Sequence, residues 1–158
     1  MKIGIVSDTH GSIDKAIDAL KKIEDLELII HLGDHADDTK KIKEIMNLDV
    51  VYVRGNCDYK DTDVELEKMI EIYGKKIFIT HGHNYDVKSG VSKLFYRGKE
   101  LNADIILFGH SHMSTKVEHE DILILNPGSP QEPRSGSKGS IGLIEISEKE
   151  LKSETIIL

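Results

Sequence analysis

Short apolar runs recur along this chain, and each ends in a glycine or a group of polar residues. Runs of this length that are rich in β-branched residues and bounded by polar loops are typical of buried strands. They cover residues 2–7, 28–32, 50–53, 76–80 and 105–108. The pattern predicts a sheet whose strands deliver polar side chains at their carboxyl ends.

Between the first runs the apolar spacing changes to that of a helix. Residues 12–24 are predicted to be helical behind Ser12 as the N-cap, with apolar positions at Ile13, Ala16, Ile17, Leu20 and Ile23. A second helix is expected from Asp37 or Asp38 to about Leu48, and a third over residues 87–101. Alternating strands and helices predict a parallel sheet with its ligand site outside the carboxyl ends of the strands.

The remaining pattern indicates antiparallel pairing. Residues 64–73 and 76–80 are expected to form a hairpin around Gly74 and Lys75. Further strands are predicted at 114–118, 122–125, 140–146 and 155–158, with residues 126–129 as a turn and 135–140 as a glycine- and serine-rich mobile loop. A parallel half would thus be followed by an antiparallel half.

Five strand ends carry residues of the kinds that bind metals. They are Asp8-x-His10, Gly33-Asp34, Gly55-Asn56-x-Asp58, His81-Gly82 and Gly109-His110-x-His112. A shared site explains why oxygen and imidazole donors recur at the same topological position. The mixture of Asp, Asn and His suits two divalent first-row ions bridged by a carboxylate, rather than a structural zinc site.

Size and charge narrow the functional classes. The 158 residues are expected to form one domain, residues 1–158, around one core. A net charge of -7 argues against non-specific binding to nucleic acid. The single cysteine, Cys57, excludes an intramolecular disulfide, and no apolar run approaches the roughly 20 residues of a membrane span. A cytoplasmic protein that does not span a membrane is predicted.

The array of motifs from Asp8 to Ser129 resembles the calcineurin-like metallophosphoesterase superfamily. The chain length, the Gly-Asn-Cys-Asp sequence and the Asn-Pro-Gly-Ser sequence are similar to its small bacterial and archaeal phosphodiesterase branch. This resemblance implies an α/β fold of four layers, αββα, in which two mixed β-sheets are flanked by helices.

The resemblance also implies a set of metal ligands. Asp8, His10 and His112 would hold one ion, Asn56, His81 and His110 the other, and Asp34 would bridge them. Mn²⁺ is the ion expected, with Ni, Co, Fe, Zn and Mg as alternatives. Such a pair of ions can generate a bridging hydroxide that attacks a phosphodiester.

One position departs from the superfamily pattern. Cys57 stands where the superfamily commonly has a histidine that protonates the leaving oxygen. The identity of the general acid therefore stays open. The predicted catalytic residues are Asp34, Asn56, Cys57 and Asp58, although Asp58 also fits a structural role.

Several polar residues near the motifs are candidates for other roles. The predicted substrate-binding residues are His83, Ser129 and Arg134, of which Arg134 could grip a phosphate with two hydrogen bonds. His35 and His83 would either touch substrate or support the ligands. Arg54 would either face the site or pair with an acid elsewhere, and His31 is interpreted as a hydrogen-bonded core histidine.

The function predicted is hydrolysis of a small phosphodiester or nucleotide-like substrate at a dinuclear site, with monoester hydrolysis secondary. The alternative is a non-catalytic metal-binding scaffold of the same fold, like a subunit of the retromer coat. A nuclease is disfavoured by the acidic charge balance and by the lack of a basic, aromatic-interleaved patch. The oligomeric state stays open, a homodimer or homotetramer being the assemblies considered.

Overall fold

The computed structural model describes residues 1–35 and 37–158, whose strands form two five-stranded sheets. Sheet A contains β1 (Lys2–Val6), β2 (Leu26–His31), β3 (Val50–Tyr52), β9 (Ser140–Ile146) and β10 (Leu151–Ile157). The order across this sheet is β10-β9-β1-β2-β3. Strands β1, β2 and β3 run parallel, whereas β9 is antiparallel to both β1 and β10.

Sheet B is mixed in the same way. Its strands are β4 (Glu67–Ile72), β5 (Lys75–Thr80), β6 (Ile105–Leu107), β7 (Ser114–His119) and β8 (Ile122–Pro127), in the order β4-β5-β6-β8-β7. The three central strands β5, β6 and β8 are parallel, and the two edge strands are antiparallel to their neighbours. Each sheet therefore contains both parallel and antiparallel strands, and the expected division into a parallel and an antiparallel half is wrong.

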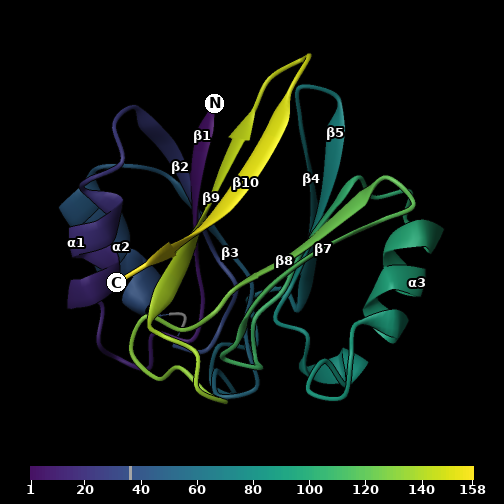
Figure 1. The fold of residues 1–158 in the computed structure, drawn as a ribbon. Coiled ribbons are helices and arrows are strands. Elements are labelled where there is room, and N and C mark those ends of the chain that lie inside the picture. Colours follow the sequence, from purple (N-terminus) through teal and green to yellow (C-terminus); the bar gives the residue numbers. More distant parts are fainter. Residues whose placement is uncertain (36) are drawn as a thin grey trace.

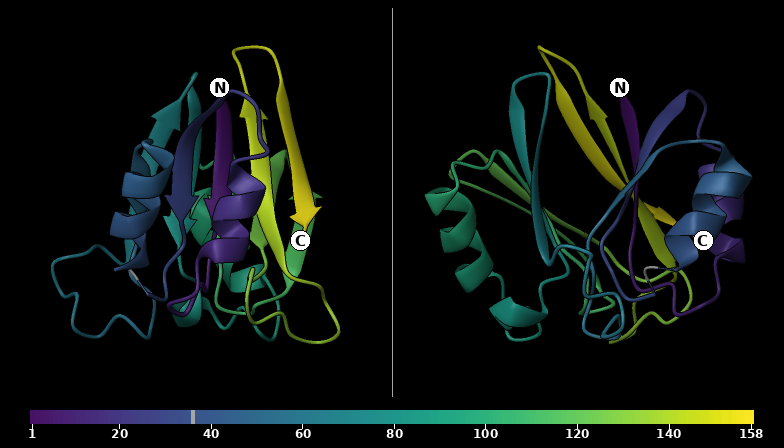
Figure 2. Two further views of the ribbon diagram at one scale, coloured as in Figure 1. Left: turned by 90° about the vertical axis from the view of Figure 1, so that its left-hand side faces the viewer. Right: turned by 180° about the vertical axis from the view of Figure 1, so that it is seen from behind.

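Helices cover the outer face of each sheet, so the molecule has four layers (Figures 1 and 2). The helices α1 (Asp14–Leu20) and α2 (Asp38–Met46) lie against sheet A, and α3 (Ser92–Glu100) lies against sheet B. A short 3-10 turn, η1 (His83–Tyr85), follows β5. This arrangement confirms the predicted αββα architecture.

Three apolar clusters fill the spaces between the four layers. The central one joins the inner faces of both sheets through residues such as Ile5, Ile30, Ile79 and Leu107. Alternate residues on the same strands face the helices, for example Ile29 toward α1 and α2. Each fully buried Ile or Leu contributes about 1.5–3 kcal/mol. These layers can therefore stabilise the fold while the loops at one edge carry strained and polar residues.

Several predicted boundaries are wrong, for local reasons. Residues 126 and 127 belong to β8 and not to a turn, because Asn126 and Pro127 stay in register with β7. The third helix begins only at Ser92, after the turn segment 86–90. Neither Ser12 nor Asp37 makes a side-chain capping bond, and Ile13 occupies the N-cap position of α1.

Candidate metal centre

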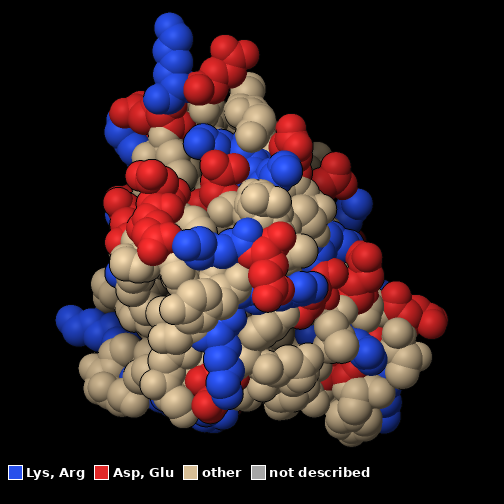
Figure 3. Space-filling view, turned by 90° about the vertical axis from the view of Figure 1, so that its right-hand side faces the viewer, with Lys and Arg blue, Asp and Glu red and all other residues tan. Residues whose placement is uncertain are grey.

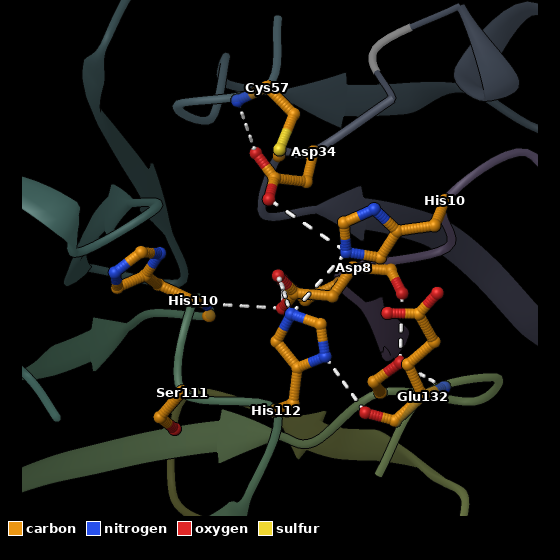
Figure 4. A network of polar contacts seen from close by, with 12 residues as sticks. Asp8, His10, Asp34, Cys57, His110, Ser111, His112 and Glu132 are labelled. Carbon is orange, nitrogen blue, oxygen red and sulfur yellow. Dashed lines mark hydrogen bonds and ion pairs between the residues drawn. The ribbon is translucent and has the colours of Figure 1, made fainter. Parts of the chain in front are cut away.

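The predicted site residues meet at one edge of the sandwich, where the parallel strands of both sheets end. Asp8 follows β1, Asp34 follows β2, and His81 follows β5. The two sheets are joined at this edge by contacts among the histidines and carboxylates, such as that of His112 with Asp8 (Figure 4). Clusters that are up to 104 residues apart in sequence, from Asp8 to His112, thus form one site.

Four of the predicted ligands form a compact group, which we call the Asp8 cluster: Asp8, His10, Asp34 and His112. One ligand atom from each lies within 4.8 Å of the others. Nε2 of His112 lies 3.2 Å from Oδ1 of Asp8 and 3.3 Å from Nε2 of His10. Nε2 of His10 lies 3.9 Å from Oδ2 of Asp34. This spacing suits donors that share one ion.

The other three predicted ligands, which we call the His81 group, are Asn56, His81 and His110. Nε2 of His81 lies 3.4 Å from Oδ1 of Asp34, and the rings of His81 and His110 are 5.1 Å apart. Asn56 is exposed, and its amide contacts the sulfur of Cys57 at 3.4 Å. The structure thus places His81 next to Asp34 and His110 next to His81, and the amide nitrogen of Asn56 faces Cys57.

Asp34 lies between the two sets of donors. Its Oδ2 faces His10, and its Oδ1 faces His81. The same Oδ1 accepts a hydrogen bond of 2.9 Å from the backbone N–H of Cys57, which ties the loop after β3 to the carboxylate. One carboxylate therefore offers an oxygen to each side, as a bridging ligand must.

Second hydrogen bonds orient the ligand side chains. Nδ1 of His81 contacts the carbonyl of Leu32 at 2.8 Å, and Nδ1 of His112 contacts the carbonyl of Glu132 at 2.8 Å. Both rings consequently present Nε2 to the site. Oδ2 of Asp8 accepts bonds from the Ser7 hydroxyl at 2.6 Å and the His110 N–H at 3.1 Å, which leaves Oδ1 for a ligand.

The backbone at the site is strained. Six non-glycine residues there have positive φ angles: Asp8, His10, Asp34, His35, His110 and His112. Such conformations cost of order 1–3 kcal/mol each and persist only where the surrounding structure enforces them. Their concentration at the convergent strand ends marks these loops as built for a functional purpose.

Two glycines allow the loops to approach each other. A Cβ on Gly55 would overlap the carboxylate of Asp34, and a Cβ on Gly109 would overlap the hydroxyl of Ser7. Only glycine leaves room for these contacts. The glycines in the Gly-Asn-Cys-Asp and Gly-His motifs are thus required by the closeness of the opposing strand ends.

A buried polar network behind the site was not predicted from the sequence. Nδ1 of His31 accepts from the N–H of Gly33 at 3.2 Å, and its Nε2 contacts the hydroxyl of Thr9 at 3.2 Å. The Thr9 hydroxyl donates to Asp38 at 2.7 Å, and Asp38 also accepts from Gly11. The network joins the Asp8 and Asp34 turns, and the interpretation of His31 as a hydrogen-bonded core residue is confirmed.

Burial shifts the protonation of this network and of the ligands. Burial lowers the pKa of His31 to about 4, so the ring stays neutral and can accept from Gly33. Burial and the neighbouring His81 lower the pKa of His110 to about 4. For His112, burial opposes protonation, but the contact with Asp8 outweighs it and raises the pKa above 6.5. For Asp8, burial favours the neutral acid, yet His112 and His81 lower its pKa overall.

The donor set fits divalent cations. Oδ1 of Asp8 and Nε2 of His81 are buried, and neither has a hydrogen-bond partner among the described residues. A buried polar atom left unsatisfied costs about 1–3 kcal/mol. Two such atoms, one anionic and one imidazole nitrogen, aimed into a site of Asp and His donors are the arrangement expected of metal ligands.

The remaining predicted site residues take different positions. Ser129 is fully buried, and its hydroxyl donates to the Asp8 carbonyl at 2.8 Å and accepts from two N–H groups, which holds the loop under the site. Asp58 accepts from the N–H groups of Asp34 and Gly55, a structural contact. Arg134 is exposed at the rim beside His112, whose carbonyl accepts its N–H at 3.2 Å.

His83, His35 and Cys57 lie beside the ligands. The ring of His83 is 5.5 Å from that of His81, and the ring of His35 is 5.3 Å from that of His10. Cys57 is exposed, and partial burial together with Asp34 raises the pKa of its thiol to about 11. A thiol with this pKa is protonated at neutral pH.

Comparison with known proteins agrees with this geometry. A model of the calcineurin-like phosphoesterase superfamily domain matches residues 1–149. The chain belongs to this superfamily. It is 35% identical over 147 residues to a probable metallophosphoesterase of Bacillus subtilis, YsnB, with 92% of this chain and 85% of that protein covered.

Two further similarities concern a curated relative and a solved structure. The chain is 33% identical over 171 residues to phosphodiesterase MJ0936 of Methanocaldococcus jannaschii, with 96% of this chain and 97% of that protein covered. A solved structure of Vps29 from Entamoeba histolytica complexed with zinc superposes with a TM-score of 0.80 at 22% identity and covers 99% of both chains. The second likeness concerns the fold alone.

Proposed function

We propose that this protein is a metal-dependent phosphodiesterase acting on a small phosphodiester or nucleotide-like substrate. The observation that carries the proposal is Asp34, which offers one carboxylate oxygen to His10 and the other to His81. A bridging carboxylate between two histidine-rich groups is suited to a pair of divalent ions. The relatives named phosphodiesterase and probable metallophosphoesterase support the same chemistry.

Two ions are proposed, Mn²⁺ first and Ni, Co, Fe, Zn or Mg as alternatives. The Asp8 cluster would hold one, and the His81 group with Asp34 would hold the other. Bound there, divalent ions would supply an activated water near neutral pH and neutralise charge on the phosphoryl oxygens. Asn56 would complete the second set through its amide oxygen, since its amide nitrogen donates to Cys57.

The chain's own residues would position and orient the substrate. Arg134 lies at the rim, and its positive charge opposes protonation of His112. It therefore lowers the pKa of His112, although the opposite effect of Asp8 is larger. The positive charge of Lys88 likewise lowers the pKa of His110, although burial and His81 have larger effects. The charge of Lys88 therefore also lies near the site. These cations would attract a phosphate ester to a protein whose net charge is -7.

Cys57 should determine which leaving groups of the substrate can depart. In most of the superfamily pattern a histidine would donate the proton, and a thiol is a poorer proton donor than an imidazolium. We therefore infer a preference for phosphodiesters with acidic, aryl-type leaving groups, which depart without a proton. Monoesters would be poorer substrates.

The alternative function is a non-catalytic scaffold. The superposition with Vps29 favours it at the level of the fold. The presence of all seven predicted ligands, from Asp8 to His112, favours the enzyme. A scaffold would need no strained backbone at six residues around that set.

A nuclease of the superfamily is a weaker candidate. Acidic and basic side chains alternate over the face seen in Figure 3, and no broad basic patch covers it. The net charge of -7 would repel a long polyanion. A small substrate with one or two phosphates avoids this repulsion.

The cellular setting is also a proposal. We propose that residues 1–158 act as one domain in the cytoplasm, as a homodimer or homotetramer. Across the part of the chain that the structure describes, there is no helix long and apolar enough to cross a membrane.

The test is metal-dependent hydrolysis. Exhaustive chelation should abolish the hydrolysis of an aryl phosphodiester, and Mn²⁺ should restore it, because the donors need an ion to activate water. A panel of diesters, monoesters and cyclic nucleotides, run with Asp34→Asn as a control, would define the substrate class. Activity that survived chelation would overturn the proposal, and a metal-loaded protein inactive on the whole panel would favour the scaffold.

A further inference from the structure

Arg54 is an incompletely paired cation beside the metal centre. It directly precedes the Gly55–Asp58 loop, its side chain is partly buried, and its Nε is inaccessible to solvent. Within residues 1–35 and 37–158 that Nε has no hydrogen-bond partner, and no carboxylate lies within ion-pair distance of the guanidinium. Buried charges in proteins are normally paired, so this one calls for an acceptor from outside the chain.

Arg97 offers a contrast to Arg54. Arg97 on α3 is also partly buried, and its guanidinium lies 3.2 Å from Glu100 and 3.7 Å from Glu67. Glu65, the acidic residue whose carbonyl accepts the Arg54 N–H, directs its own carboxylate to Lys68 at 2.8 Å. A carboxylate is therefore available on the adjacent segment, and the structure does not use it for Arg54.

His83 presents a second unpartnered atom on the same flank. Its Nδ1 is buried without a hydrogen-bond partner among the described residues. Its ring stands 5.5 Å from that of His81 and 6.2 Å from that of His110. Both unpartnered atoms belong to residues that flank the His81 group, since Arg54 lies two residues before Asn56 and His83 lies two residues after His81.

The backbone fixes Arg54 relative to Asp34. The Arg54 N–H donates to the carbonyl of Glu65 at 3.0 Å. Gly33 has a φ of 98°, and a Cβ there would lie 3.0 Å from the carbonyl carbon of Arg54. The turn that carries Asp34 is thus packed directly on Arg54, so the guanidinium has a defined starting point beside the shared carboxylate.

We propose that Arg54 and His83 form an anion subsite that binds a non-bridging phosphoryl oxygen of the substrate and retains the phosphate group of the product. Arginine suits this role because its guanidinium can donate two parallel hydrogen bonds to a phosphate. The subsite lies on the His81 side of the centre, whereas Arg134 lies on the His112 side. The naming of the anion as a phosphate ester rests on the proposed function.

The test is the binding of inorganic phosphate, measured by calorimetry on the Mn²⁺-loaded protein. The variants are Arg54→Gln, Arg54→Lys and His83→Gln, with Arg97→Gln as the matched control. Loss of hydrogen bonds to a charged group predicts a Kd about tenfold to a hundredfold higher in Arg54→Gln. Arg54→Lys should recover part of the loss, His83→Gln should raise Kd by a smaller factor of about three to ten, and Arg97→Gln should stay within about twofold.

Thermal unfolding without phosphate separates a binding role from a structural one. An arginine without an acceptor adds little to the fold, so Arg54→Gln should unfold at or above the wild-type Tm and should lose the Tm increase that phosphate gives. Manganese content should be unchanged, because Arg54 is not a ligand. A lower Tm together with an unchanged phosphate Kd would show that Arg54 is structural, and would overturn the subsite.

The outcome is separable from that of the proposed function. Arg54-dependent phosphate binding by a protein that hydrolyses no diester would support the subsite and contradict the phosphodiesterase proposal. Diester hydrolysis with the same phosphate Kd and the same KM in wild type and Arg54→Gln would support the phosphodiesterase proposal and contradict the subsite. Wild-type protein that bound no phosphate would also overturn the subsite.

Discussion

The two halves of the metal centre differ in how completely the fold assembles them. In the Asp8 cluster, one ligand atom from each of the four residues already lies within 4.8 Å of the rest. In the His81 group, the two histidines are close, but Asn56 is exposed and donates to Cys57. The donors of the first half are gathered within the fold, whereas the second half depends on an exposed loop residue.

The difference follows from where the residues come from. Asp8 and Asp34 follow β1 and β2, adjacent parallel strands tied by the Asp8 N–H to Gly33 carbonyl bond of 3.1 Å. Asn56 follows the edge strand β3 and begins a long excursion that leads to β4 (Figure 2). Central strands position their ends more rigidly than an edge strand does, so we expect the Asp8 cluster to bind an ion first and more tightly.

Replacing the shared carboxylate should have the largest effect. Asp34→Asn removes the negative charge from both halves, and we expect kcat/KM with Mn²⁺ to fall by about a thousandfold or more. The core of Ile5, Ile30 and Leu107 is untouched, so circular dichroism should stay native-like. Asp49→Asn, at an exposed pair with Lys43, is the control. Turnover near the wild-type rate would show that Asp34 does not bridge.

Removing one ligand from each half should separate two binding steps. His112→Ala should weaken the tighter Mn²⁺ step by about a hundredfold, because the preformed cluster loses a donor oriented by the Glu132 carbonyl. His110→Ala should weaken the second step and leave the first nearly intact. Calorimetric titration of Mn²⁺ resolves the two. If both variants lost the same step, the halves would not be separate sites.

Cys57 lies on the same loop as Asn56 of the His81 group. Replacing it should change which leaving groups of the substrate are preferred. Cys57→His supplies an acid with an ordinary pKa near 6.5, so alkyl diester turnover should rise about tenfold to a hundredfold. Cys57→Ala should change aryl diester turnover little. The measurement is kcat/KM on matched aryl and alkyl diesters. Loss of most activity on both substrates in Cys57→Ala would show that the thiol participates.

The smallest effect should be a difference in pH dependence. The pKa of His112 is raised above 6.5, and the protonated ring stabilises the ion-free fold through Asp8. This stabilisation is full below pH 6.5 and disappears as the pH rises through the folded pKa. Protons therefore compete with the metal, and the affinity of the tighter step should rise by up to about tenfold per pH unit below that pKa.

The His81 group should behave differently over the same range. The pKa of His110 is lowered to about 4, so this ring is already neutral near pH 6 and releases no proton when a metal binds. Mn²⁺ titrations at pH 6, 7 and 8 would compare the two steps. Equal slopes for both steps would contradict the assignment of His112 and His110 to separate halves.

Local sequence was sufficient for the strands and the ligand types. The apolar run of β1 and the polar residues that follow it predicted both a buried strand and Asp8 at its end, because both faces of a central strand are buried and its loop is not. Strand ends that depend on pairing with a neighbouring strand were predicted wrongly. Asn126 and Pro127 resemble a turn locally, but pairing with β7 extends β8 through them.

The supporting contacts could not be predicted, because they join segments far apart in the chain. No local pattern indicates that Thr9, His31 and Asp38 share a buried network, or that the Leu32 carbonyl orients His81. The sequence held only a general indication, namely that a histidine inside an apolar strand needs polar partners. The partners themselves depend on how β1 and β2 pair.

The chain's residues therefore determined which groups could bind metal, since Asp, Asn and His recur at the end of one strand after another. They also determined that these ends would share an edge, since parallel strands terminate together. Tertiary structure alone decided that β9 returns to β1, that Asp34 faces both halves, and that Nε of Arg54 has no hydrogen-bond partner among the described residues. Sheet order, side-chain direction and the absence of a partner are properties of packing between distant segments, which no local spacing encodes.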